Sequence, residues 1–148
     1  MAKKVDWIIH GVCDGQRVNF HTHGMERYNH MDFQMVLPYP HQELCRIINT
    51  MGLRVQEGER FKDGDLVAGI YEDCNVQLMV YEETRRNVLR IIVPDKNNRF
   101  PYEQGCEYPY TLQLLPTDFL VPVEKYPPST NHHTERRNIN ANQHRPAR

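Results

Sequence analysis

Apolar and polar residues alternate in two short runs near the start of the chain, residues 5–12 and 16–23. Alternation with a period of two is typical of β-strands that bury one face. Cys13-Asp14-Gly15 separates the runs, and Asp-Gly between two such segments favours a tight hairpin because both loop positions need positive φ. The pattern therefore predicts a hairpin whose two loop residues are Asp14 and Gly15.

This register sorts the side chains of the hairpin by face, since neighbouring strand residues point in opposite directions. It places Asp6 opposite His23 and His10 opposite Asn19. The face predicted to turn toward the core carries Trp7, Ile9, Gly11, Val18, Phe20 and Thr22. The other face, predicted to be turned toward solvent, carries Asp6, His10, His21 and His23.

A third strand is predicted at residues 32–37, ending at Pro38-Tyr39-Pro40. Beyond the prolines, apolar residues recur at the spacing of one stripe on an α-helix. That stripe consists of Leu44, Ile47, Ile48 and Met51. Gly52 follows it directly and is predicted to be the left-handed cap that ends the helix.

The rest of the pattern favours strands over helices. Residues 66–71 and 76–81 predict a second hairpin, and residues 88–93 form an apolar run typical of a well-buried strand. Residues 82–87 fit either a loop or a helical turn, and residues 94–109 predict a long Pro/Gly-rich loop. Because hairpins outnumber helical crossovers, the predicted fold is α+β: a predominantly antiparallel sheet with one main helix packed on a face.

Composition divides the chain into two parts. Its 148 residues suit one hydrophobic core, but the residues after Val123 are almost all polar. We predict a single α+β domain over residues 1–123 and a polar basic tail over residues 124–148. The tail carries a formal charge of +3, which leaves −4 on the domain because the whole chain carries −1.

These properties also narrow the expected partners and location. An acidic domain has no electrostatic footprint for nucleic acid, so we do not expect a nucleic-acid partner. No apolar run approaches the roughly 18 residues that a bilayer crossing needs, so we expect no membrane partner. Met1-Ala2-Lys3-Lys4 leads into the alternating stretch without the apolar segment of a signal peptide, so we expect a cytoplasmic protein. The four cysteines are scattered and form no Cys-x-x-Cys pair, which predicts reduced thiols.

Four residues of the first hairpin form a candidate metal site. His21 and His23 lie two positions apart on one predicted strand, and His10 and Asp6 come from the partner strand. Imidazole and carboxylate suit zinc or another divalent ion. The alternative is that these are partly exposed polar side chains that hydrogen-bond to each other and to water.

Two separated motifs occur in a familiar order. The first is Phe20-His21-Thr22-His23-Gly24-Met25; the second is residues 88–95 followed by Arg99-Phe100-Pro101-Tyr102-Glu103. On these motifs the chain resembles the domain of unknown function 4262 family over about residues 18–118. The resemblance implies a shared fold and a cytoplasmic protein of bacterial or phage type, and it implies no particular activity.

The same two motifs supply the candidate ligand-binding residues. A small ligand would lie between a turn and a loop, whose residues are His21, Thr22, His23, Gly24, Asp95, Arg99, Phe100 and Tyr102. Arg99 would hold a carboxylate or phosphate in two hydrogen bonds. In the alternative, Asp95 bonds backbone amides of its own turn while Phe100 and Tyr102 pin the loop to the core.

Three classes of function remain open. The preferred class is a non-catalytic domain that binds a small ligand or a protein. The second is a metal-dependent hydrolase in which His21 and His23 hold the ion and Glu26 or Asp32 acts as general base. The third is an interaction protein whose basic tail mediates assembly, for example into a homo-oligomer. The arginines at positions 85, 86 and 90 are expected on a solvated face rather than in an anion site.

Overall fold

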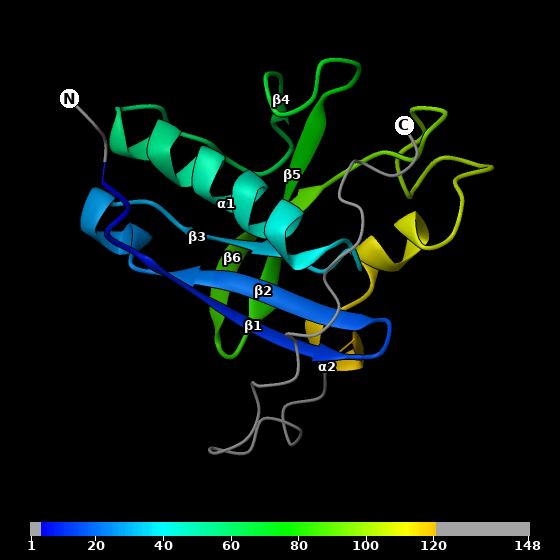
Figure 1. Ribbon diagram of the computed structural model, residues 1–148, viewed down its shortest axis with the longest axis horizontal. Helices are drawn as coiled ribbons and strands as arrows, with labels where there is room; N and C mark the ends of the chain where they lie inside the picture. The colour runs from blue at the N-terminus through cyan, green and yellow to red at the C-terminus, as the bar shows by residue number, and fades with distance from the viewer. Residues whose placement is uncertain (1–3, 121–148) are drawn as a thin grey trace.

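The computed structural model describes residues 4–120, which contain a six-stranded sheet in the order β1-β2-β3-β6-β5-β4 (Figure 1). The strands are β1 Ile8–Asp14, β2 Arg17–His23, β3 Asp32–Met35, β4 Leu66–Val67, β5 Val76–Glu83 and β6 Arg86–Ile92. β3 and β6 pair in parallel, and the other neighbours are antiparallel. The predicted α+β fold is confirmed. The predicted tail at 124–148 lies outside the described residues.

One face of the sheet packs against the main helix, α1 His41–Gln56 (Figure 1). Its buried stripe is the predicted one, extended by Val55. Gly52 lies inside the helix rather than at its end, and a Cβ there would stand 2.5 Å from Trp7 Cζ2. The prediction of Gly52 as cap is wrong, because glycine at this position lets the indole ring approach the helix closely. Gly58, with a φ of 114°, follows the last turn instead.

The opposite face of the sheet is also covered, by a short 3₁₀ helix, η2 Tyr110–Leu114, and a single turn, α2 Thr117–Leu120. Thr117 Oγ1 accepts hydrogen bonds from Gln34 Nε2 at 3.1 Å and from Arg90 Nη2 at 3.0 Å. Both partners are fully buried. This face is therefore a second interior made largely of polar side chains.

Arg90 lies at the centre of that polar interior, so the expectation of a solvated face is wrong for this residue. Its guanidinium donates to Gln34 Oε1 at 2.7 Å and to the carbonyl oxygens of Gln113 and Leu115 at 2.8 and 2.6 Å. It also lies over the ring of Tyr81, with Cζ 3.5 Å from the ring centroid. Neutral acceptors and an aromatic face thus satisfy a buried cation, as burial of charge requires.

The first hairpin forms where predicted, but its register differs. Gly15 and Gln16 make the loop, and Gly15 alone of the two has positive φ, at 66°, which is the pattern of a type II′ turn. His10 consequently stands opposite His21. The pairing has shifted by two residues, and an even shift leaves every side chain on its predicted face.

The chain between β5 and β6 is a third hairpin, where a loop or helical turn was predicted. Thr84 and Arg85 form its loop with φ values of 53° and 70°. Positive φ at both positions defines a type I′ turn, usually signalled by Asn-Gly. Thr-Arg carries no such signal, so the sequence pattern missed the hairpin. In the described part of the chain, no helix has the length and apolar character needed to cross a membrane.

Candidate metal centre

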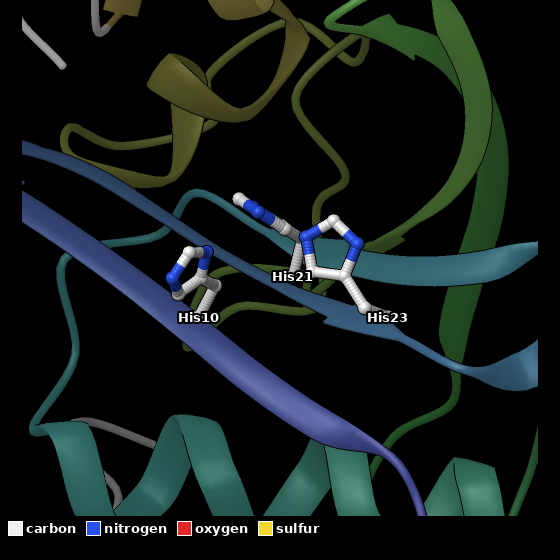
Figure 2. A group of neighbouring side chains, drawn as sticks. All are labelled: His10, His21 and His23. Carbon is white, nitrogen blue, oxygen red and sulfur yellow. The ribbon is translucent and has the colours of Figure 1, made fainter. Parts of the chain in front are cut away.

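Three histidine side chains converge on the sheet face that lies away from α1 (Figure 2). His10 comes from β1, and His21 and His23 come from β2. One ring nitrogen of each lies within 4.8 Å of those of the other two. His21 is 4% exposed, whereas His10 and His23 are exposed. The hairpin thus brings together three of the four predicted metal ligands, with one inside the protein and two at the surface.

The fourth predicted ligand, Asp6, is not part of this group. Tyr28 Oη donates to its two carboxylate oxygens at 2.6 and 2.8 Å, and Arg27 Nη1 lies 3.3 Å from Oδ2. The cause is the register shift, which places Ile8 rather than Asp6 opposite His23. The carboxylate instead binds the short helix η1 Met25–Tyr28.

Burial keeps the inner imidazole neutral. It lowers the pKa of His21 to about 3, and the nearby His23, Arg86 and His10 act in the same direction against the opposing effect of Glu83. The pKa of His23 is also lowered, first by partial burial and then by Arg86 and His10. A neutral imidazole has the lone pair that a metal needs, so protons compete little for these two side chains at neutral pH.

The hydrogen-bond partners of His21 assign its tautomer. Its Nδ1 lies 3.2 Å from Asn19 Oδ1 and 3.5 Å from Glu83 Oε2. Asn19 Oδ1 also accepts from Gln34 Nε2 at 3.1 Å, which identifies that atom as the amide oxygen. Since both neighbours of Nδ1 are acceptors, Nδ1 carries the proton and Nε2 carries the lone pair.

A charged cluster lies behind the histidines. Arg86 donates to Asp32 Oδ2 at 2.6 Å, to Glu83 Oε1 at 3.0 Å and to the carbonyl oxygen of Thr22 at 2.9 Å. Glu83 and Arg86 were missed as site residues because residues 82–87 were predicted as a loop or a turn. The type I′ hairpin places both side chains at the edge of the histidine group.

Asp32, a predicted general base, is already fully engaged. Besides Arg86, it accepts from Thr22 Oγ1 at 2.6 Å and from the backbone N–H of Met25 at 3.0 Å. Thr22 is buried, and Gly24 adopts a φ of 127° where a Cβ would stand 3.1 Å from Trp7 Cβ. Thr22 and Gly24, both predicted to bind a ligand, thus shape the end of β2.

The second motif forms a self-contained loop. Asp95 is fully buried, and its oxygens accept the backbone N–H groups of Asn97 and Arg99 at 2.9 Å each and of Glu107 at 3.0 Å. This is the alternative in which Asp95 bonds backbone amides. Arg99 Nη1 donates weakly to the Gly105 carbonyl oxygen, at 3.4 Å.

The aromatic residues of that loop stack on each other. The rings of Phe100 and Tyr102 are 5.8 Å apart and nearly parallel, and Tyr102 remains 54% exposed while its hydroxyl donates to Gln77. Phe100 lines a shallow hollow together with the β4–β5 connection, and this hollow includes none of the three histidines.

The two groups of predicted ligand-binding residues, 21–24 and 95–102, lie toward opposite ends of β6. Arg86 begins the strand beside Thr22, and Asp95 follows its far end. Seven residues of strand span roughly 20 Å. The structure therefore does not bring these two groups of residues together into one pocket, because the length of β6 keeps them apart.

Comparisons with protein-family models, with curated proteins and with solved structures found no match. The resemblance to the domain of unknown function 4262 family stays a prediction.

Proposed function

We propose that this chain is a non-catalytic binding domain whose ligand is a divalent transition-metal ion held by His10, His21 and His23. The convergence of three ring nitrogens within 4.8 Å carries this proposal. Imidazole suits zinc, copper, nickel and related ions. Metal–nitrogen bonds of about 2.0–2.1 Å place tetrahedral ligands roughly 3.4 Å apart. The rings therefore need to close by on the order of 1 Å, and the two exposed histidines have room to rotate.

The charge state of the site supports the same proposal. His21 and His23 are neutral at neutral pH because burial lowers both pKa values. An imidazole that binds through its lone pair adds no charge, so three histidine ligands leave the full charge on the ion and one tetrahedral position for water or a small ligand.

The surroundings of the two predicted general bases, Asp32 and Glu26, favour metal binding without hydrolysis. Asp32 is saturated by Thr22, Met25 and Arg86. Glu26 lies on η1 and lines a separate hollow with His30 and Arg60. The predicted hydrolase assigned the general base to one of these two carboxylates, and neither of them belongs to the histidine group.

Two further predictions accompany this proposal. A cytoplasmic location is supported by the four cysteines, which form no disulfide with one another within residues 4–120. Assembly through the basic tail concerns residues outside those that the structure describes, and it stays a prediction.

Metal titration of the full chain tests the proposal. After EDTA stripping, we expect Zn²⁺ and Co²⁺ each to bind one to one in competition with a chromogenic chelator. His21→Ala, His10→Ala and His23→Ala should each weaken binding by more than the roughly 10–100-fold that loss of an outer-shell partner costs, because each removes one of three direct ligands. His41→Ala is the matched control, since His41 belongs to α1 and contacts Phe20 on the other face.

The tail contains His132 and His133, so their double alanine variant is a second control and should bind as the native chain does. Unchanged affinity in all three hairpin variants, with melting temperatures showing that they fold, would refute the proposal.

A further inference from the structure

Glu83 is a buried carboxylate that reaches the inner histidine from a distant strand. It ends β5, and β3 and β6 separate that strand from β2 in the sheet. Its side chain is nevertheless only 3% exposed, with Oε2 3.5 Å from His21 Nδ1. A carboxylate in this place faces the protonated nitrogen and leaves Nε2 for a metal.

The carboxylate is itself held in position. Oε1 accepts from Arg86 Nε at 3.0 Å, and Oε2 accepts from Thr84 Oγ1 at 3.0 Å. Arg86 and Glu83 form an ion pair in which the carboxylate is only 3% exposed. The charged carboxylate is therefore held in a fixed orientation beside His21 Nδ1.

We propose that Glu83 is a positioning residue for the metal centre, which acts by orienting His21 and by strengthening its Nε2 as a donor. The inference rests on the proposed function. A metal draws electron density from the imidazole, which makes the Nδ1 proton more positive, and a charged acceptor stabilises that state more than a neutral one does. Asn19 supplies the hydrogen-bond geometry at 3.2 Å, and Glu83 supplies the charge.

The inference also explains why two hairpins meet here. Arg86 joins Glu83 to Asp32, and Asp32 binds Thr22 beside the two ligands of β2. The β5–β6 hairpin thus acts as the support behind the β1–β2 hairpin. Outer carboxylates of this kind typically change metal affinity by about 10–100-fold.

Glu83→Gln tests the inference, because glutamine keeps the shape of the side chain and removes its charge. We expect the affinity for Zn²⁺ and Co²⁺ to fall by about 10–100-fold at fixed pH. Glu83→Asp, which keeps the charge, should recover part of that loss. Glu82→Gln is the matched control on the neighbouring exposed residue and should bind as the native chain does.

A double variant separates positioning from a purely structural role. In the His21→Ala background, Glu83→Gln should cause no further loss of affinity, because the ligand through which it acts is gone. A lower melting temperature with native affinity would overturn the inference, as would a loss as complete as that of His21→Ala, which would make Glu83 a direct ligand. Native affinity in His21→Ala itself would refute the proposed function instead.

Should Glu83→Gln fail to fold, Thr84→Ala offers a milder probe. It removes only the hydroxyl that holds Oε2. A several-fold loss of affinity is expected, and native affinity in this variant would then overturn the inference.

Discussion

The two faces of this sheet are buried in different ways. Beneath α1, side chains such as Phe33 and Leu89 are fully buried among other apolar groups. On the opposite face the neighbouring residues Gln34 and Arg90 are equally buried, but each is held by directed hydrogen bonds. Apolar burial is non-directional and tolerates substitution of similar volume. A buried polar side chain can be substituted without a large loss of stability only if every hydrogen-bond donor and acceptor around it keeps a partner.

The difference also explains where the candidate centre lies. Among the residues that the structure describes, the group of His, Cys, Asp or Glu side chains spaced for a metal ion lies on the polar face. The polar face already orders His21 through Asn19 and Glu83. An orienting network of this kind is what a metal site needs around its ligands.

The strongest test of the comparison uses adjacent residues on β6 that point to opposite faces. Leu89→Met conserves volume and should lower the free energy of unfolding by less than about 1.5 kcal/mol. Arg90→Met removes the donors to the buried carbonyl oxygen of Gln113, to the partly buried carbonyl oxygen of Leu115 and to Gln34 Oε1, at about 1–3 kcal/mol for each unsatisfied group. We therefore expect a loss of at least about 3 kcal/mol, measured by urea unfolding at pH 7.

Equal decreases in the free energy of unfolding of the two methionine variants would show that hydrogen bonds contribute little to the stability of the polar face. The comparison of faces would then fail.

The second test measures how low pH affects stability through Asp95, in the loop that leads from β6 to the polar face. Asp95 holds that loop ahead of η2, and its hydrogen bonds from backbone N–H groups keep its pKa below the ordinary 3.8 despite the opposing effect of burial. A carboxyl group whose pKa is lower in the folded than in the unfolded state stabilises the fold at any pH above its ordinary pKa. That stabilisation is lost as the pH falls through the folded-state pKa. Asp95→Asn should cost about 2 kcal/mol at pH 7.

The measurement is the free energy of unfolding from pH 7 down to pH 2. The gap between native chain and Asp95→Asn should narrow below about pH 4, where the native carboxyl takes up its proton. Asp14→Asn, at the exposed end of β1, is the control and should show little difference at pH 7. A gap that stays constant with pH would contradict a role for the charge.

The smallest expected effects concern the two hairpin turns. Gly15 and Arg85 have nearly the same φ, 66° and 70°, although only glycine adopts it without strain. Arg85→Gly should raise stability by about 0.5–1 kcal/mol, and Gly15→Ala, which meets no neighbour within 4 Å, should lower it by about as much. Thermal unfolding of both variants measures these changes in stability. A lower stability of Arg85→Gly would show that the Arg85 side chain makes contacts that outweigh the strain of its backbone.

Much of the candidate centre was accessible from the sequence. His21 and His23 share a face because they lie two positions apart on one strand. His10 lies on the same face in both the predicted and the observed register, because the two registers differ by an even number of residues. The error did matter for Asp6, because a two-residue shift moves each side chain by about 7 Å along the strand.

The sequence by itself determined the position of the first hairpin, the buried stripe of α1 and the faces of β1 and β2, because periods of 2 and 3.6 residues are properties of neighbouring side chains. Only the tertiary structure decided that Glu83 meets His21, that Arg90 is buried and that β6 keeps residues 21–24 apart from residues 95–102. These outcomes depend on strand order, sheet twist and the return of η2 and α2 over the second face. They join residues that are tens of positions apart, and no short pattern encodes such contacts.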